Sequence, residues 1–424
     1  MFPGDAVSVE VEGIVPGGAG LARYEGRVLF IRRSAPGERL RVRVHRSHGS
    51  WAEAGILEIL EASPRRVRPR CPLCENAGSG GCGGCSFQHL DYGFQLEVKA
   101  HILRESFCRV GGFSGDEPCL RALEEPRSFP SAAWEYRNRV QLHAVRPGGM
   151  APSGKTTPSG ETAPSGPRVG FTSSAGAETR VIPANDCPVA DPGIRALLGS
   201  GELEAPAGRD RFTVYSRGGM VLKEGGRSRG RVRLRNRDLL MDAGLFFQSN
   251  AAMLEVLLED LDSIAAEADH SLPLADLYCG VGTFASFLSA YFPYADLLEE
   301  NRAALALARQ NLDPGGHNFY AFTDNEWVKI KEPERRSAGY GLIVADPPRQ
   351  GLSPPMRRWL AQGPAPLLAY VSCDPATLAR DSGELVQGAW ELVDLACYDF
   401  YPQTAHIESL ALFRNRHGYR QPPA

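Results

Sequence analysis

The chain has 424 residues, of which 43% are hydrophobic and 23% are charged, and its formal net charge is −3. This composition is ordinary for a soluble globular protein of two or three domains, and the charge excludes a uniformly basic polynucleotide binder. No apolar run approaches the about 20 residues that a membrane span requires, and the start MFPGDAVSVEVEG lacks the features of a signal peptide. We therefore expect a cytoplasmic protein without membrane contact. Its ten cysteines should then serve a purpose other than disulfides.

The first 62 residues have the pattern of short strands. Runs such as AVSVEVEGIV, RVLFIRR and RLRVRVHR alternate apolar and polar residues with Gly and Pro between them, which predicts a small five-stranded barrel over residues 1–62. Residues 1 to 70 hold twelve Arg and no Lys against eight Asp plus Glu. Because arginine matches phosphate and stacks on bases, this excess indicates either contact with RNA or a solvated strand face, and charge alone leaves both open.

A cysteine-rich segment opens a second predicted domain over residues 63–240. The segment CPLCENAGSGGCGGCSFQHL contains two C-x2-C pairs, whose thiols are Cys71, Cys74, Cys82 and Cys85. Read alone, the two pairs suggest tetrahedral zinc, although the seven residues between them are few for a zinc ribbon.

The rest of this second domain alternates helix, strands and a long polar segment. Apolar residues at helical spacing followed by Gly-Gly predict a helix over residues 90–113, and short apolar runs between residues 134 and 235 predict strands. Residues 151–166, APSGKTTPSGETAPSG, repeat Pro-Ser-Gly three times and have too few apolar side chains to pack, so a loop is expected.

From about residue 240 the pattern changes to strands alternating with helices. LPLADLYCGVGTFASFLSAYF, ADLLEENRAALALARQNL, YGLIVADPPRQGLS and PLLAYVSCDPATLARD each give an apolar strand, a loop and a helix. This pattern predicts a doubly wound parallel sheet over residues 241–424, with the ligand past the carboxyl ends of the strands. The loops YCGVGT, LEEN, DPPRQG and SCDP should therefore converge on one crevice.

The glycine loop of this third domain suggests a nucleoside cofactor. Gly280 and Gly282 allow a tight turn where a strand meets a helix, and Glu299, about 20 residues further along, is placed to accept hydrogen bonds from a ribose. The third glycine of the dinucleotide fingerprint is absent, because Phe284 or Ala285 stands there, which favours S-adenosylmethionine over NAD. A purely structural turn with a surface Glu299 is the alternative.

One cysteine lies where a strand should give way to a helix. Asp374 is a good N-cap and Pro375 a favoured first helical residue, so Cys373 is expected at a helix N-terminus, where the dipole lowers the pKa of a thiol. Asp346 ends the preceding strand, and Glu408 begins the last apolar run. A nucleophilic thiolate beside a carboxylate and a cofactor is one interpretation; a packed cysteine and a solvated glutamate are the other.

Together these motifs resemble the RNA 5-methyluridine (uracil-C5) methyltransferases that carry a TRAM domain and an iron-sulfur cluster. The resemblance covers most of the chain, and DPPRQGL, VSCDPATLARD and PQTAHIE in this order are its most specific part. It implies an α/β fold with a class I (Rossmann-like) S-adenosylmethionine-dependent catalytic domain, an N-terminal OB-like TRAM barrel and a central β-rich iron-sulfur domain. The family usually has Asn where this chain has Asp374, and both residues cap helices well.

The resemblance also implies an activity and a set of site residues. Cys373 would add to C6 of a flipped-out uridine, and Glu408 would remove the C5 proton after methyl transfer. The positions that match the family's cofactor-binding residues are Gln248, Tyr278, Thr283, Glu299, Asp324 and Asp346. The family's cluster ligands correspond to Cys71, Cys82, Cys85 and Cys187, with Cys74 as a rival to Cys71; the other cysteines are expected to pack.

The resemblance indicates RNA as the partner, 23S rRNA ahead of tRNA, and a monomer. An enzyme that methylates an exocyclic amine is an alternative, because DPPR is similar to the NPPY loop of such enzymes. A non-catalytic RNA-binding iron-sulfur protein is another.

Overall fold

The computed structural model describes residues 2–75, 81–114, 127–145, 168–173, 181–313, 315–334 and 339–417. The predicted loop at 151–166 lies outside these residues. The chain divides into two compact units. The first contains Met1–Val98, Ala132–Ser228 and Tyr401–Ala405, and the second contains Lys99–Ser131, Arg229–Phe400 and His406–Ala424.

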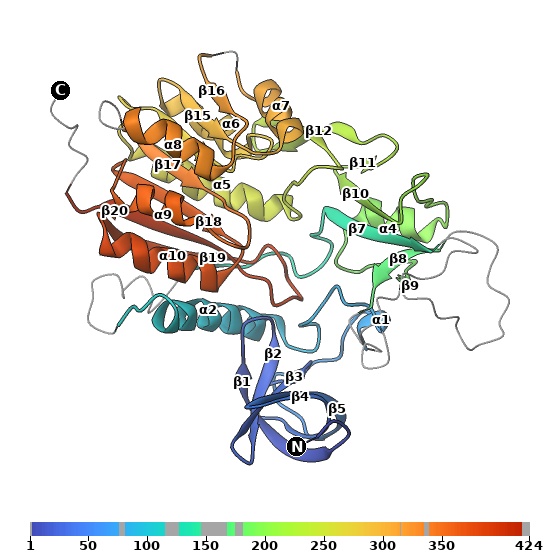
Figure 1. Ribbon diagram of the computed structural model, residues 1–424. Helices are drawn as coiled ribbons and strands as arrows, with labels where there is room; N and C mark the ends of the chain where they lie inside the picture. The colour runs from blue at the N-terminus through green and yellow to red at the C-terminus, as the bar shows by residue number, and fades with distance from the viewer. Residues whose placement is uncertain are drawn as a thin grey trace. The chain divides into compact units, whose positions relative to one another are not determined.

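The first unit begins with the predicted barrel. Its strands are β1 (Ala6–Ile14), β2 (Ala19–Tyr24), β3 (Arg27–Arg32), β4 (Arg39–His48) and β5 (Trp51–Glu61). They close in the order β1-β2-β3-β5-β4 (Figure 1). Alternation places Leu40, Val42 and Val44 of β4 in the barrel core, so the small N-terminal barrel is confirmed.

The arginines on the outer face of the barrel are largely paired. The side chain of Arg39 lies 2.8 Å from that of Glu61, and Arg41 lies 3.4 Å from Glu58, so neighbouring strands neutralise each other. These pairs fit the solvated strand-face interpretation for this part of the arginine excess.

The remainder of the first unit is a small antiparallel sheet beside the cysteine segment. Its elements are α1 (Pro72–Glu75), β7 (Arg139–Val145), β8 (Arg168–Thr172), β9 (Val181–Pro183), α4 (Pro192–Gly199), β10 (Arg211–Arg217) and β11 (Met220–Lys223). The strand order is β11-β10-β7-β8-β9. Leu142, Phe212 and Ile194 pack α4 against the sheet.

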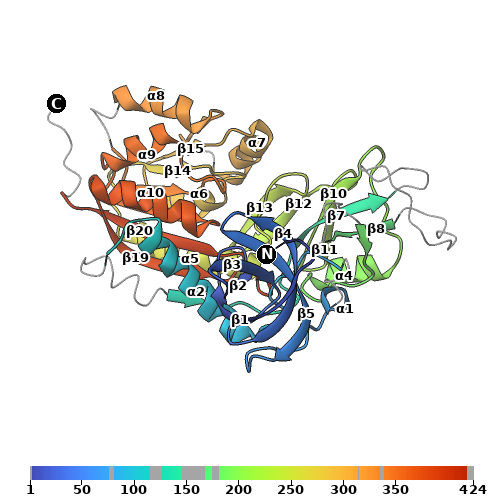
Figure 2. The same cartoon turned by 60° about the horizontal axis from the view of Figure 1, so that its bottom comes forward.

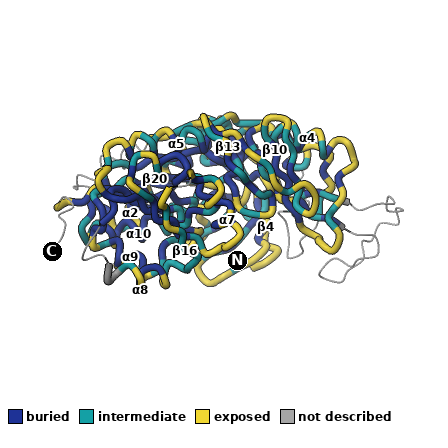
Figure 3. The backbone as a smooth tube through the Cα atoms, turned by 90° about the horizontal axis from the view of Figure 1, so that it is seen from above, coloured by how far each residue is buried: buried dark blue, intermediate teal, exposed yellow. Residues whose placement is uncertain are grey.

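The second unit is built on one eight-stranded sheet. In spatial order its strands are β16 (Asn318–Tyr320), β15 (Ala295–Leu298), β14 (Leu274–Leu277), β17 (Leu342–Ala345), β18 (Leu367–Ser372), β20 (Glu408–Asn415), β19 (Trp390–Tyr398) and β6 (Arg127–Phe129). The five strands from β16 to β18 are parallel, and β20 is antiparallel to β18. Every residue of β14, β15, β17 and β18 is buried, and Figure 3 shows the buried run along β20.

Helices cover both faces of this sheet. The helices are α2 (Tyr92–Arg109, shared with the first unit), α5 (Ala251–Ala266), α6 (Thr283–Leu288), α7 (Arg302–Asn311), α8 (Asp324–Glu334), α9 (Pro354–Ala361) and α10 (Pro375–Gln387), with a short 3-10 turn, η2 (Ser289–Tyr291). One row is α5-α6-α7 and the other is α8-α9-α10 (Figures 1 and 2). The hairpin of β12 (Arg229–Leu234) and β13 (Arg237–Asp242) contacts α7. The doubly wound sheet expected for the catalytic domain is confirmed.

Three expectations are not decided by the fold. The predicted boundaries at residues 62 and 240 stay predictions, as do the monomeric state and the cytoplasmic location. Within the described part of the chain, no helix is both long enough and apolar enough to cross a membrane.

Candidate active site

The glycine loop after β14 is shaped by left-handed backbone and by a carboxylate. Gly282 has φ 77°, and a Cβ there would lie 2.9 Å from Ala308 Cβ, so the loop and α7 approach too closely for a side chain. The carboxylate of Glu299 accepts hydrogen bonds from Gly280 N at 3.0 Å and Asn301 N at 2.7 Å. Glu299 therefore lies against the glycine turn, as the ribose hypothesis requires.

Two of the other predicted cofactor residues are joined by a hydrogen bond. The Tyr278 hydroxyl donates to Asp324 Oδ2 at 2.7 Å, and the same oxygen accepts from Ser353 N at 3.1 Å. Tyr278 itself has φ 63°, an uncommon conformation for a bulky residue. Thr283 is the first residue of α6, directly after the glycine turn. The structure thus places Tyr278 directly after β14, and Thr283 and Asp324 at the first residues of α6 and α8, beyond the carboxyl ends of the strands.

Two buried polar atoms at this edge of the sheet have no protein partner among the described residues. Gln248 is 8% exposed, and its Oε1 accepts no hydrogen bond. Asp276 is fully buried; its Oδ2 accepts from Ala285 N at 2.9 Å, whereas its Oδ1 has no partner. Buried polar atoms are normally satisfied, so these oxygens fit a polar cofactor such as S-adenosylmethionine.

Sequence reasoning missed Asp276. Burial raises the pKa of its carboxyl to about 7, and the charges of Asp346 and Glu299 act in the same direction. Burial likewise raises the pKa of Asp346 to about 7. The available signal was an acidic residue inside the apolar run that leads directly into the glycine loop.

The strand register brings Cys373 and Glu408 to the same level of the sheet. Ser372, the last residue of β18, pairs with Ser409, and the Ser409 hydroxyl donates to Ser372 O at 3.2 Å. Cys373 directly follows Ser372 and Glu408 directly precedes Ser409, so the two lie at the same end of this antiparallel pair, where the charge of Glu408 acts on the thiol. Glu408 is only 2% exposed, which excludes a solvated strand-end glutamate.

The expectation about the helix cap is confirmed, but the expectation about the pKa is wrong. Asp374 accepts a hydrogen bond from Thr377 N at 2.8 Å, and α10 begins at Pro375. The pKa of the Cys373 thiol is nevertheless raised to about 11, first by burial and then by the negative charges of Glu408 and Asp346. Desolvation and two carboxylates outweigh the helix dipole, whose effect is worth less than about 2 kcal/mol.

Arg349 supplies the opposing positive charge. It follows Asp346 in DPPR, and it lowers the pKa of both Cys373 and Glu408. Burial first, and then Asp346, raise the pKa of Glu408 well above its usual value. The charges of these four side chains therefore interact, and the thiol and the two carboxyls can exchange protons with one another.

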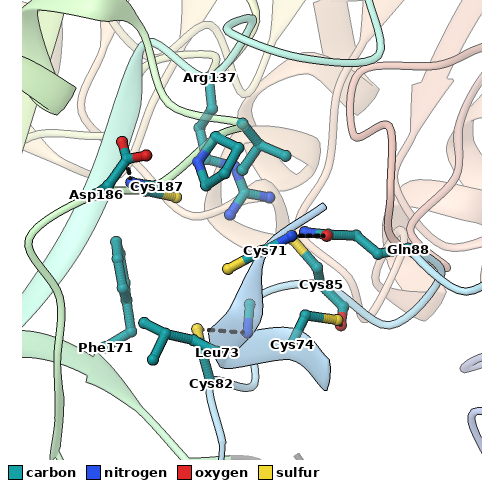
Figure 4. A pocket seen from close by; sticks show the side chains of 13 residues that line it. Cys71, Leu73, Cys74, Cys82, Cys85, Gln88, Arg137, Phe171, Asp186 and Cys187 are labelled. Carbon is teal, nitrogen blue, oxygen red and sulfur yellow. Dashed lines mark hydrogen bonds between the residues drawn. The ribbon is translucent and has the colours of Figure 1, made fainter. Parts of the chain in front are cut away.

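Five cysteines of the first unit line one small cavity. Cys71, Cys74, Cys82, Cys85 and Cys187 surround about 30 Å³ of space together with Arg137 (Figure 4). Burial is the main cause that raises the pKa of Cys82 and Cys85, that of Cys74 to about 11 and that of Cys187 to about 12, and neighbouring cysteines add to it. Segments more than 100 residues apart in the sequence thus converge as the resemblance implied.

The surroundings of Cys74 differ from those of the others. Its sulfur lies 3.3 Å from Arg33 Nη1 and 3.7 Å from Cys85 O, and in Figure 4 it points away from the space that Cys71, Cys82 and Cys187 face. Among the described residues, no three His, Cys, Asp or Glu side chains lie close enough together to hold a metal ion. This finding supports neither the zinc interpretation nor the iron-sulfur expectation.

The fold and the site define a class I methyltransferase that uses S-adenosylmethionine. Residues 2–57 match the TRAM domain family, and residues 320–416 match the family described as tRNA (Uracil-5-)-methyltransferase. The chain is similar to the tRNA (uracil-54, C5)-methyltransferase of Pyrococcus abyssi, solved with S-adenosyl-L-homocysteine, with a TM-score of 0.65, 21% identity and coverage of 96% of this chain and 100% of the other.

Two relatives match along nearly the whole chain. An uncharacterized RNA methyltransferase of Treponema denticola is 30% identical in an alignment of length 413 that covers 92% of this chain and 94% of the relative. The 23S rRNA (uracil(1939)-C(5))-methyltransferase RlmD of Alkalilimnicola ehrlichii is 30% identical in an alignment of length 450, gaps included, that covers 97% of each chain. The protein belongs to the RNA (uracil-C5)-methyltransferase family. Its substrate is RNA, and the family favours C5 of uracil over an exocyclic amine.

Proposed function

We propose that this enzyme methylates C5 of a uridine in 23S rRNA through a covalent bond between Cys373 and C6 of the base. The observation that carries the proposal is the register of β18 and β20, which brings Cys373 and the buried Glu408 to the same end of the strand pair. The 30% identity to a relative named as a 23S rRNA methyltransferase supports the choice of RNA.

The chemistry follows from the weak nucleophilicity of C5 in uracil. Cys373 gives up its proton to a neighbouring carboxylate, and its sulfur bonds to C6 while the C5–C6 π electrons move toward C5 and O4. C5 then bonds to the methyl group, and the electrons of the broken S–CH₃ bond stay on the departing sulfur. Glu408 takes the C5 proton, the C5–C6 double bond re-forms, and the Cys373 thiolate leaves.

The raised pKa values suit this order of events. Burial raises the pKa of the Asp346 carboxyl, so Asp346 can hold the proton that Cys373 releases, and Glu408 stays available to take the C5 proton. Arg349 stabilises the anionic state of the set at each step, because it opposes the charges that raise the pKa of the thiol.

We assign cofactor binding to six residues around the glycine loop and the strand ends. They are Gln248, Tyr278, Thr283, Glu299, Asp324 and Asp346. S-adenosylmethionine supplies the methyl group as an electrophile. Glu299 is placed for ribose hydroxyls, and Gln248 offers its unpartnered Oε1.

We also propose that the cysteine cavity holds a 4Fe-4S cluster that cross-links the segments around residues 71–85 and 187. The ligands would be Cys71, Cys82, Cys85 and Cys187, because the Cys74 sulfur is engaged with Arg33 instead. A cluster in this cavity would tie the two segments together, because its thiolate ligands would come from both.

Anaerobically purified cysteine variants test this assignment. We expect Cys85→Ser to lose iron, sulfide and the visible absorbance of the cluster, whereas the matched control Cys74→Ser keeps them. Metal analysis and absorbance spectra of both proteins give the answer. Zinc in place of iron in the wild-type protein, or iron loss in Cys74→Ser alone, would contradict it.

RNA that carries 5-fluorouridine tests the proposed mechanism. Fluorine cannot leave as a proton, so with S-adenosylmethionine present we expect a covalent protein–RNA adduct that survives denaturation. The matched arms are a 23S rRNA fragment and a tRNA transcript. An adduct with the tRNA alone would show that tRNA is the substrate. Methylation without any adduct would contradict the covalent mechanism.

A further inference from the structure

The loop that follows β17 is held along its backbone by three charged side chains of α9 and α10. Arg380 Nη2 donates to Gln350 O at 2.9 Å, and Leu352 N donates to Asp381 Oδ2 at 2.9 Å. Arg357 Nη1 donates to Leu352 O at 2.8 Å. This loop carries Asp346 and Arg349 at its start, so these bonds fix the part of the site that surrounds the thiol.

Asp381 links this loop to the strand that ends at the thiol. Its carboxylate is fully buried and also accepts the hydroxyl of Tyr370 at 2.7 Å. Tyr370 lies in β18, three residues before Cys373. Arg380 Nε donates to Asp381 Oδ1 at 2.8 Å, so the carboxylate is paired with a guanidinium.

Gly351 shows how closely the loop fits this carboxylate. Its φ is 75°, and a Cβ built on it would lie 2.6 Å from Asp381 Oδ2 and 2.7 Å from Arg380 Nη2. No side chain can stand there unless the ion pair moves. At Gly351 the loop backbone therefore lies directly against the Arg380–Asp381 pair, and a side chain there would push the two apart.

We propose that Asp381, together with Arg380, is a positioning residue that sets Asp346 and Arg349 at the distance from Cys373 that catalysis needs. A buried ion pair is a weak source of stability, because desolvation offsets its attraction. The Arg380–Asp381 pair instead fixes the position of the loop relative to β18, because the Asp381 carboxylate binds both a β18 side chain and the loop backbone. The proposal rests on the proposed role of Cys373.

Conservative variants separate positioning from stability. Asp381→Asn keeps the size of the side chain but loses the charge that orients Arg380, and Gly351→Ala disturbs the same contact from the loop side. We expect each to lower kcat by about 10- to 100-fold, as misplacements of about 1 Å do. We expect KM for S-adenosylmethionine to change less than kcat, because the glycine loop and Glu299 are untouched.

Asp296→Asn is the matched control. Asp296 is 2% exposed, accepts the Tyr340 hydroxyl at 2.7 Å and pairs with Lys331 at 2.8 Å, but it lies near the amino end of β15. It should therefore lose stability as Asp381→Asn does and keep kcat. Folded fractions are matched by circular dichroism before the kinetics are measured with RNA and S-adenosylmethionine at saturation.

The outcomes distinguish the positioning role of Asp381 from the proposed nucleophilic role of Cys373. Wild-type kcat in folded Asp381→Asn and Gly351→Ala would overturn the positioning role, and so would an equal loss of kcat in Asp296→Asn. Cys373→Ala is assayed alongside. If that variant methylates RNA normally, the thiol mechanism fails, whereas the kcat of the Asp381 variant still reports on the loop by itself.

Discussion

Replacing Cys373 with alanine is expected to lower the rate of uridine methylation by at least roughly 10⁴-fold, because loss of a covalent nucleophile removes the whole route through the adduct. Cys373 is partly exposed at the tip of β18, so its removal leaves the buried strand intact. The thermal midpoint of the variant should therefore stay close to that of the wild type. The measurement is transfer of a labelled methyl group from S-adenosylmethionine to RNA.

The control for this variant is another thiol of the same unit. Cys397 is 2% exposed in β19, so its replacement by alanine leaves a small cavity in the core. The proposed mechanism does not use this thiol. We expect Cys397→Ala to lose stability and keep its turnover. The covalent role of Cys373 would be refuted by an active Cys373→Ala enzyme, and it would be strengthened by loss of the 5-fluorouridine adduct in that variant alone.

Local signals were enough to locate the catalytic unit. Asp374 and Pro375 mark the start of α10, and Gly282 marks a turn that no side chain can occupy, so the sequence predicted where strand, loop and helix meet. Tyr278 and Asp324 were assigned to one site from the family resemblance, and a parallel sheet explains why residues so far apart in the sequence meet at one edge.

What the sequence could not predict depends on contacts between distant segments. The pKa of Cys373 depends on burial and on Glu408 and Asp346, and the neighbouring cap residue Asp374 gives no information about them. The role of Asp381 is equally hidden, since an acidic residue on a helix usually faces water. Cys74 could be distinguished from the other cysteines only from its contact with Arg33, a residue of the N-terminal barrel segment that is distant in the sequence.

Replacing Glu408 with glutamine should stop the reaction after methyl transfer. The methylated adduct cannot lose its C5 proton without a base, so the Cys373–C6 bond persists and turnover falls by about 10²- to 10⁴-fold. Unlike the wild type, this variant should form a denaturation-resistant complex with ordinary uridine RNA, and it should transfer no more than one methyl group per enzyme. A denaturing gel and a methyl-transfer time course measure both.

The fold should accept this substitution well. Burial and Asp346 raise the pKa of Glu408, so its ionised form costs the folded protein free energy above the pKa of an unfolded glutamate, and a neutral amide removes that cost. Glu408→Gln should thus be at least as stable as the wild type at neutral pH. Glu391→Gln, a half-buried position on β19, is the control and should turn over normally. Loss of turnover without a trapped complex would place Glu408 before bond formation to C6 and contradict its role as the base that releases the product.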